Sequence, residues 1–168
     1  FSQRAGVHGG TNLRDHLIWQ ARLAGFDQTE GAVAMHLIDN VNEEGWLEDY
    51  ADICERLLPE LDYDEKLIER VLSIVQDFDP PGVAARDLRE CLLIQLKQLP
   101  NDTPGLDLAQ KIVSQYLELL AAHDPFRLAT KLKASPEAVM LAEKVILGLN
   151  PKPGTAYTKH EDTYVEPD

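Results

Sequence analysis

Apolar residues recur along most of the chain at the three- and four-residue spacing of amphipathic helices. No stretch alternates apolar and polar residues with the period of two that marks a half-buried strand. The pattern therefore predicts an all-α fold. Residues 1–11 are polar, contain glycine and lack this periodicity, so we expect a disordered lead-in before the first helix.

The first half of the pattern predicts helices whose starts are marked by capping residues. Thr11 or Asn12 can cap the first helix, and capping boxes that begin at Asp27 and Asp62 introduce two others. A short helix is expected over residues 49–58. The residues expected to face a core in these helices are Leu13, Leu17, Ala21, Ala24, Ala34, Leu37, Ile38, Val41, Tyr50, Ile53, Cys54, Leu57, Leu67, Ile68, Val71, Leu72, Val75 and Phe78.

The clearest internal boundary is the Pro-Asn-Asp-Thr-Pro-Gly stretch over residues 100–105. The helix before it, over residues 86–99, is apolar over so wide an arc that it must be central to a core or shared between two. We expect two helical subdomains, over residues 12–100 and 101–150. From residue 151 to residue 168 the period is lost, which predicts an extended tail.

Two similar proline-containing turns interrupt the helices. Proline cannot continue a helix, and glycine accepts the backbone angles of a tight turn, so both predict rigid structural turns. Each turn follows a short helix and a longer capped helix, a repeat that resembles helix-turn-helix geometry. A DNA-reading unit and a compact packing unit both fit this repeat, and we favour packing. The turn residues are Asp79, Pro80, Pro81, Gly82, Pro151, Pro153 and Gly154.

The chain is acidic, with 16 Lys and Arg against 29 Asp and Glu and a formal net charge of −13. This balance argues against the chain gripping nucleic acid alone, because neutralising phosphates needs clustered cations. Residues 43–90 hold fifteen acids and five bases, whereas residues 126–159 hold six bases and two acids. We therefore expect two faces with different partners. The acidic middle suits either a basic protein surface or simple solubility.

The residues that could carry chemistry do not form a catalytic pattern. The five histidines are dispersed and lack metal-ligand spacing, and no glycine-rich phosphate loop occurs, so neither a metal nor a cofactor is expected. A hydrolase could use the acid pairs Asp62/Asp64 and Asp77/Asp79, but they stand beside helix ends, where capping explains them better. We therefore expect no enzymatic activity.

The cysteines and the hydropathy of the chain indicate where in the cell it would work. Cys54 and Cys91 lie among apolar residues and are expected to be small buried side chains, which fits a reducing cytoplasm. No apolar run approaches the ~18 residues of a membrane span, and no signal peptide is visible.

Charged residues on both sides of the first proline turn give the candidate protein-binding site. Arg86, Arg89 and Glu90 are expected on the polar arc of one helix, with Glu65 and Glu69 on the helix before it. Arg86 and Glu90 are four residues apart and could simply support the helix surface. A docking strip and surface support both stay open at this point.

The string FDPPGVAARDLRECLL over residues 78–93 resembles a phrase of the core-binding region of bacterial sigma-54 transcription factors. The string LGLNPKPG over residues 147–154 resembles a second phrase of the same family. Residues 45–47 stand where the family has a glycine–tyrosine–leucine turn, with Trp46 replacing the tyrosine. Residues 164–168, YVEPD, resemble the opening of the family's next segment.

The resemblance implies an all-α domain that docks on core RNA polymerase. In that family, promoter DNA and an ATP-dependent activator act through other regions, a glutamine-rich N-terminal region and C-terminal promoter-reading elements. We expect those regions to be absent from this chain, which would keep polymerase docking and lose promoter reading. The alternative hypothesis is a helix-turn-helix DNA-binding module, which the net charge disfavours.

Overall fold

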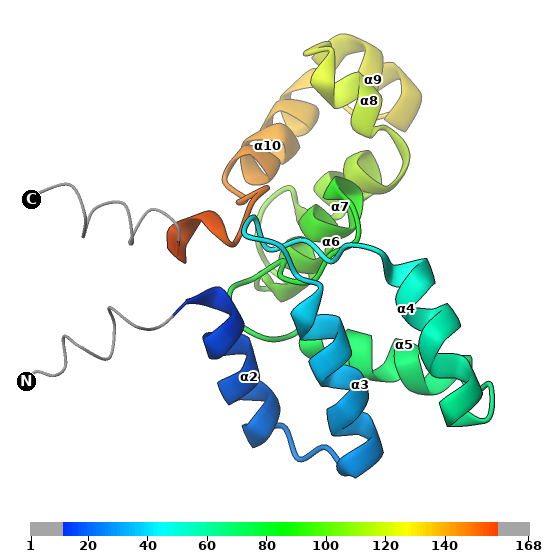
Figure 1. Cartoon of the computed structure of the whole chain (residues 1–168). Helices are drawn as coiled ribbons and strands as arrows, with labels where there is room; N and C mark the ends of the chain where they lie inside the picture. The colour runs from blue at the N-terminus through cyan, green and yellow to red at the C-terminus, as the bar shows by residue number, and fades with distance from the viewer. Residues whose placement is uncertain (1–11, 158–168) are drawn as a thin grey trace, which may run out of the picture. The chain divides into compact units, whose positions relative to one another are not determined.

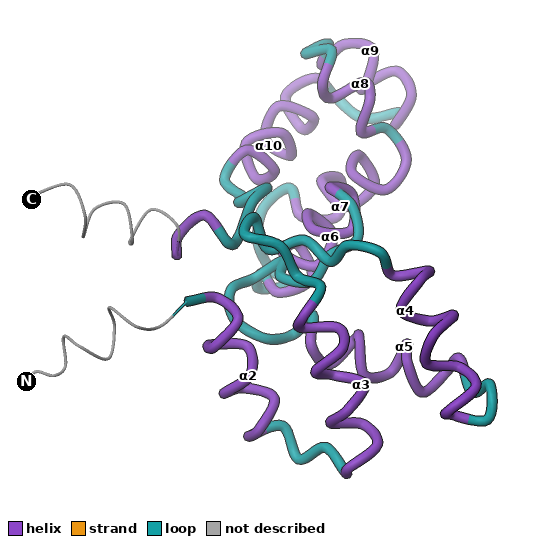
Figure 2. The backbone as a smooth tube through the Cα atoms, viewed as in Figure 1, coloured by secondary structure: helices purple, strands orange, loops and turns teal. Residues whose placement is uncertain are grey.

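A computed structural model describes residues 12–157 (Figure 1) and confirms the all-α fold. Over these residues the backbone forms helices α2 to α10 and one 3₁₀-helix, η1, and no strand (Figure 2). No helix of this part of the chain is both long enough and apolar enough to cross a membrane. The expected lead-in, residues 1–11, lies outside the described residues.

The chain divides into two compact units. Among the described residues, the first unit comprises 12–86 and 152–157, and the second comprises 87–151. This division differs from the expected boundary after residue 100. The reason is that the helix before that boundary packs in the second unit, and the residues after 151 return to the first.

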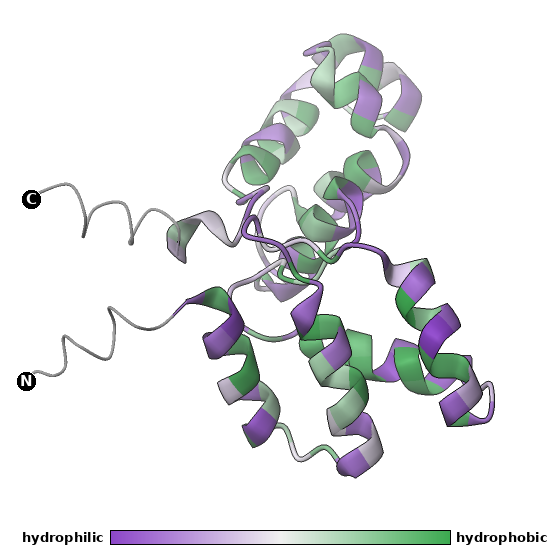
Figure 3. Cartoon of the chain, viewed as in Figure 1, coloured by the Kyte–Doolittle hydropathy of each residue, from purple (hydrophilic) through white to green (hydrophobic). Residues whose placement is uncertain are grey.

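The first unit contains α2 (Leu13–Leu23), α3 (Gln28–Asp39), α4 (Tyr50–Leu57), η1 (Leu58–Leu61) and α5 (Glu65–Val75). Its helices carry apolar residues along one side and polar residues along the other, as Figure 3 shows. The buried apolar residues form one core, made of Leu13, Leu17, Val33, Ala34, Leu37, Ile38, Leu47, Ile53, Leu57, Ile68, Val71, Leu72, Val75, Phe78, Val83 and Ala84.

Capping confirms most of the helix starts predicted for this unit. The Asn12 side chain accepts from the N–H of Asp15, and Asp27 and Glu30 form a complete capping box. The box expected from Asp62 is wrong, because Asp62 adopts a left-handed φ of 54° and ends η1. Asp64 caps α5 in its place.

The second unit contains α6 (Leu88–Gln98), α7 (Leu106–Gln115), α8 (Leu117–Ala121), α9 (Pro125–Leu132) and α10 (Pro136–Leu147). Ser135 caps the start of α10, and a proline stands in its first turn. Leu92 and Leu96 bring α6 into the core of this unit, which is why α6 belongs here. The other buried members of that core are Leu106, Ala109, Ile112, Val113, Leu128, Ala129, Val139, Ala142 and Ile146.

The tail expected to be extended from residue 151 instead begins with a turn. Thr155 donates through its N–H to the Lys152 carbonyl at 3.0 Å, and Tyr157 donates to Gly154 at 3.1 Å. Residues 155–157 are helical, so the prediction is wrong for this stretch. The rest of the expected tail lies outside the described residues.

Candidate protein-binding site

A glutamine side chain holds the first proline turn. Gln20 of α2 donates from Nε2 to the carbonyl oxygen of Asp79 at 2.7 Å. The main-chain N–H of Asp79 donates back to Gln20 Oε1 at 2.8 Å. The Asp79–Pro80 peptide bond is cis, and Gly82 has a φ of 91°. Gln20 thus satisfies both main-chain groups of the residue that precedes the proline.

A second glutamine holds the second proline turn in the same way. Gln95 of α6 donates from Nε2 to the carbonyl oxygen of Asn150 at 2.6 Å, and the Asn150 N–H donates to Gln95 Oε1 at 2.9 Å. The Gln95 side chain is only 7% exposed, whereas Asn150 lies at the surface, so these bonds are partly buried. Sequence reasoning missed both glutamines. The available signal was a polar residue inside the apolar arc of α6.

The buried Cys91 thiol belongs to this second turn. Its Sγ lies 3.7 Å from the carbonyl oxygens of both Asn150 and Pro151. Burial raises the pKa of the Cys91 thiol, and the hydrogen bond from Gln95 partly opposes that shift. Cys91 and the half-buried Cys54 are both free thiols.

Within the first unit, the turn at Gly45 forms a meeting point, where it binds residues 84 and 85 of the string over residues 78–93 and residue 154 of the string over residues 147–154. The Ala84 N–H donates to the Gly45 carbonyl, and the Leu47 N–H donates to the Ala85 carbonyl, each at 2.8 Å. From the string over residues 147–154, the Gly154 N–H donates to the Glu44 carbonyl at 2.8 Å. Three short segments that are far apart in the sequence therefore share one set of main-chain hydrogen bonds.

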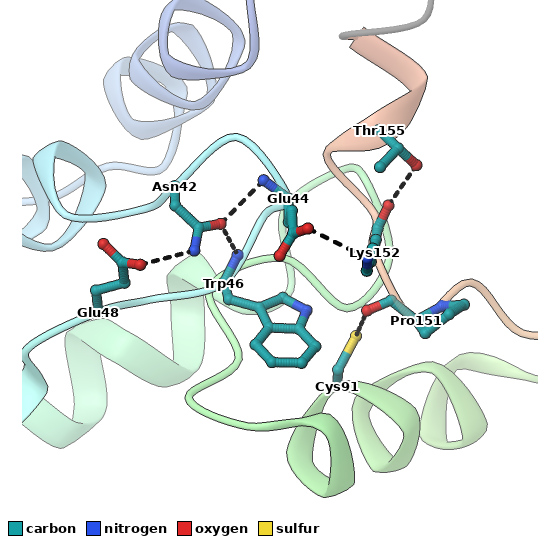
Figure 4. A network of polar contacts seen from close by, with 8 residues as sticks. All are labelled: Asn42, Glu44, Trp46, Glu48, Cys91, Pro151, Lys152 and Thr155. Atoms are coloured by element: carbon teal, nitrogen blue, oxygen red, sulfur yellow. Dashed lines mark hydrogen bonds and ion pairs between the residues drawn. The ribbon is translucent and has the colours of Figure 1, made fainter.

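Side chains reinforce this meeting point (Figure 4). Asn42 Oδ1 accepts from the N–H groups of Glu44 and Trp46, at 2.9 and 3.1 Å, and Asn42 Nδ2 donates to Glu48 at 3.0 Å. Lys152 Nζ lies 3.2 Å from Glu44 Oε2. The asparagine fixes the shape of the loop, and the lysine ties the returning segment to it.

Arg86, the first candidate docking residue, does not lie on a helix. Asp87 is the N-cap of α6, which starts at Leu88, so the expectation that Arg86 shares the polar arc of that helix is wrong. The Arg86 guanidinium instead lies 4.8 Å from the centroid of the Tyr50 ring. Burial, and then the hydrogen bond with Cys54, raise the pKa of Tyr50, while the Arg86 charge acts in the opposite direction.

The other four candidate docking residues divide between the two units. Glu65 and Glu69 are exposed on α5 in the first unit. Arg89 is committed inside the second unit, where Nε donates to the Val113 carbonyl at 3.1 Å and Nη2 to Glu118 Oε1 at 3.2 Å. Glu90 lies in the first turn of α6. Of the three residues expected on one helix, Arg89 and Glu90 lie on α6 and Arg86 does not.

Charge is divided unequally between the two units. The described part of the first unit holds seventeen acids and seven bases, an excess of ten negative charges. The second unit holds eight acids and seven bases and is nearly neutral. The acidity is thus a property of the first unit. Within residues 12–157, no cluster of three or more His, Cys, Asp or Glu side chains could hold a metal ion.

The helix pairs predicted from the repeat are present. The short α4 precedes the longer α5, and the short α9 precedes the longer α10. The second pair carries exposed cations at Arg127, Lys131, Lys133 and Lys144. The DNA-reading and packing interpretations of these pairs both remain hypotheses.

Comparison with known proteins gives a consistent match. The family described as "Sigma-54 factor, core binding domain" matches residues 3–168. The RNA polymerase sigma-54 factor of Pseudomonas putida is 39% identical over 160 residues, which cover 95% of this chain and 32% of that protein. The factors of Escherichia coli and Shewanella violacea are 42% and 43% identical over 158 residues, covering 93% of this chain. The chain spans about a third of the length of these relatives.

Proposed function

The chain belongs to the sigma-54 factor core-binding domain family, and we propose that it binds core RNA polymerase through protein–protein contacts. The observation that carries this proposal is the family match over residues 3–168. Two helical units with their own cores and the excess of negative charge on the first unit support this proposal.

The acidic first unit is the primary docking element in this proposal. An excess of negative charge accelerates encounter with a basic surface and disfavours acidic partners. Arg86, Glu65 and Glu69 are its contact residues, and Arg89 and Glu90 contribute from the second unit. Because Arg89 already binds Val113 and Glu118, its replacement also loosens α6.

The proline turns act as architecture in this proposal. Asp79, Pro80, Pro81 and Gly82 shape one turn and Pro151, Pro153 and Gly154 the other, each tied down by the main-chain and glutamine bonds described above. Gly82, Pro153 and Gly154 are buried, which supports a structural role over a contact role.

In the whole factor, promoter DNA and the ATP-dependent activator would act through regions other than this chain. The chain would itself carry no catalysis and would work in the cytoplasm, where transcription factors of this family meet polymerase. Free, unbridged Cys54 and Cys91 fit that setting.

The proposal is tested by equilibrium binding of the purified chain to core polymerase. We expect binding that weakens as salt rises, and a loss of affinity for Arg86→Glu. Arg56→Glu is the matched control, since Arg56 is exposed on α4 and pairs only locally, 3.2 Å from Asp52. Absence of binding by the unaltered chain would contradict the proposal. Equal affinities of the two variants would contradict only the choice of Arg86.

A helix-turn-helix DNA module is the second candidate function. The exposed cations of α9 and α10 favour it, and the overall charge opposes it. A gel shift with promoter DNA decides between the two, because a DNA reader would retain DNA at physiological salt and a polymerase-docking module would not.

A further inference from the structure

Two large apolar side chains of α2 face solvent. Trp19 is 58% exposed and Leu23 is 67% exposed, although the same helix buries Leu13 and Leu17 in the core. Residues four apart on a helix are neighbours on one face. Isolated exposed apolar residues are ordinary on protein surfaces. Trp19 and Leu23 matter because of what surrounds them.

The Trp19 ring is held in place by its neighbours. It stacks on the His16 ring, with centroids 6.2 Å apart and an interplanar angle of 14°. His16 in turn contacts the Tyr157 ring, with centroids 5.7 Å apart. A side chain that is already oriented loses little conformational entropy when a partner binds. Trp19 is therefore a preorganised aromatic surface.

A fixed carboxylate stands beside this surface. Asp79 Oδ2 lies 3.2 Å from His16 Nε2, and the Asp79 side chain is 67% exposed. Gln20 binds both main-chain groups of Asp79, and Pro80 follows, so the carboxylate stands on a constrained backbone. Most of its surface is left open to solvent.

An exposed tryptophan beside a fixed carboxylate suits one kind of side chain particularly well. The arginine guanidinium stacks on aromatic faces and pairs with carboxylates. The surrounding unit, with its excess of ten negative charges, also favours a cationic partner. Tryptophan and arginine are, moreover, the residues that most often dominate binding energy at interfaces.

We propose that Trp19, Leu23 and Asp79 form a docking spot for an arginine-bearing segment of a protein partner. The proposal rests on the function proposed above, so the segment belongs to core polymerase. Trp19 receives the guanidinium plane, Asp79 neutralises its charge, and Leu23 covers the aliphatic part of the arginine side chain or its apolar neighbour.

Site-specific photo-crosslinking tests this spot. A photoreactive amino acid replaces Leu23 in the full chain, and a matched variant carries it in place of Tyr63, which is 70% exposed in the same unit. Both variants are irradiated on purified core polymerase. We expect a crosslink to an arginine-containing polymerase peptide from position 23 and none from position 63. Trp19→Ala should weaken binding about thirtyfold or more, the effect of losing an interface hot spot.

The outcomes separate the two proposals. If the chain binds polymerase but position 23 yields no crosslink, or Trp19→Ala binds like the unaltered chain, the docking spot is refuted and polymerase binding stands. If the unaltered chain does not bind, both proposals fail. A crosslink from position 23 only to a second copy of the chain also refutes the spot. Because Trp19 is 58% exposed, we expect Trp19→Ala to leave the melting temperature unchanged. An unchanged melting temperature shows that the fold of the variant is intact.

Discussion

Replacement of Gly154 by alanine tests the meeting point at Gly45 directly. A Cβ atom at residue 154 would overlap the carbonyl oxygen of Glu43 and would stand 2.7 Å from the Gly45 nitrogen. Both neighbours are main-chain atoms, so no side chain can rotate away. The φ angle of Gly154 lies outside the left-handed range, so the conflict is steric alone. The returning segment must therefore shift away from the Glu43–Trp46 turn.

The magnitude follows from the contacts that such a shift disturbs. Overpacking costs about 1–3 kcal/mol. Loss of the 2.8 Å hydrogen bond from Gly154 to Glu44 adds about 1 kcal/mol. The exposed ion pair between Lys152 and Glu44 adds little. We expect a loss of about 3 kcal/mol in the free energy of unfolding, which lowers the melting temperature by roughly 6–12 °C in a chain of this size.

Thermal melts should be paired with hydrogen exchange at the Gly154 amide, which reports detachment of the returning segment. Two glycine variants serve as controls. Gly25→Ala isolates backbone strain, because φ is 80° and no atom lies within 4 Å of the added Cβ. Gly148→Ala should be nearly silent, because φ is −78° and the nearest contact is an ordinary 3.4 Å. Unchanged melting and unchanged Gly154 protection in Gly154→Ala would refute the reasoning.

The remaining predictions concern the two glutamines and the buried titratable groups. Gln95→Ala should lower the free energy of unfolding in urea by about 1–3 kcal/mol, because both main-chain groups of Asn150 lose their partner and these bonds are partly buried. Gln20→Ala should cost less, because water can reach Asp79, and equal losses would contradict this account. Burial raises the folded-state pKa of Cys91 above 9.0 and the folded-state pKa of Tyr50 and Tyr157 above 10.0. The contribution of each group to stability is complete below its unfolded-state pKa and is lost as pH rises toward its folded-state pKa. The urea midpoint of unfolding should therefore decrease above about pH 9. Cys91→Ala should reduce the part of this decrease that begins at the lowest pH, because the thiol has the lowest unfolded-state pKa of the three groups. A flat profile through about pH 10.5 would contradict the burial of these groups.

Local signals predicted most of the helices. Periodicity and capping identify α2 from Asn12 and α3 from Asp27, because a cap and the turn it serves are adjacent in the sequence. The prediction at Asp62 failed because Asp62 and Tyr63 both adopt left-handed φ, which a capping-box pattern cannot reveal. The wide apolar arc of α6 indicated a central helix but could not say which core it joins. Its Leu92 and Leu96 contacts lie with α7 to α10, beyond the expected boundary.

Tertiary partners explain what the sequence could not predict about the site. Gln95 binds Asn150, 55 residues away, and Gln20 binds Asp79, 59 residues away, so no local pattern identifies either bond. Arg86 was expected on a helix face, but Asp87 takes the cap position and leaves Arg86 in the preceding loop. The resemblance rested on four short stretches, at residues 45–47, 78–93, 147–154 and 164–168. It did not show that parts of the first three meet at Gly45.

Displacement of a full-length sigma-54 factor from core polymerase tests the central claim most directly. Labelled full-length factor is bound to purified core polymerase, and the unlabelled chain is titrated in at several salt concentrations. We predict concentration-dependent displacement that weakens as salt rises, with Arg56→Glu as effective as the unaltered chain. A chain that is folded, as shown by its melting transition, and that releases no labelled factor at any salt would contradict the assignment of polymerase docking.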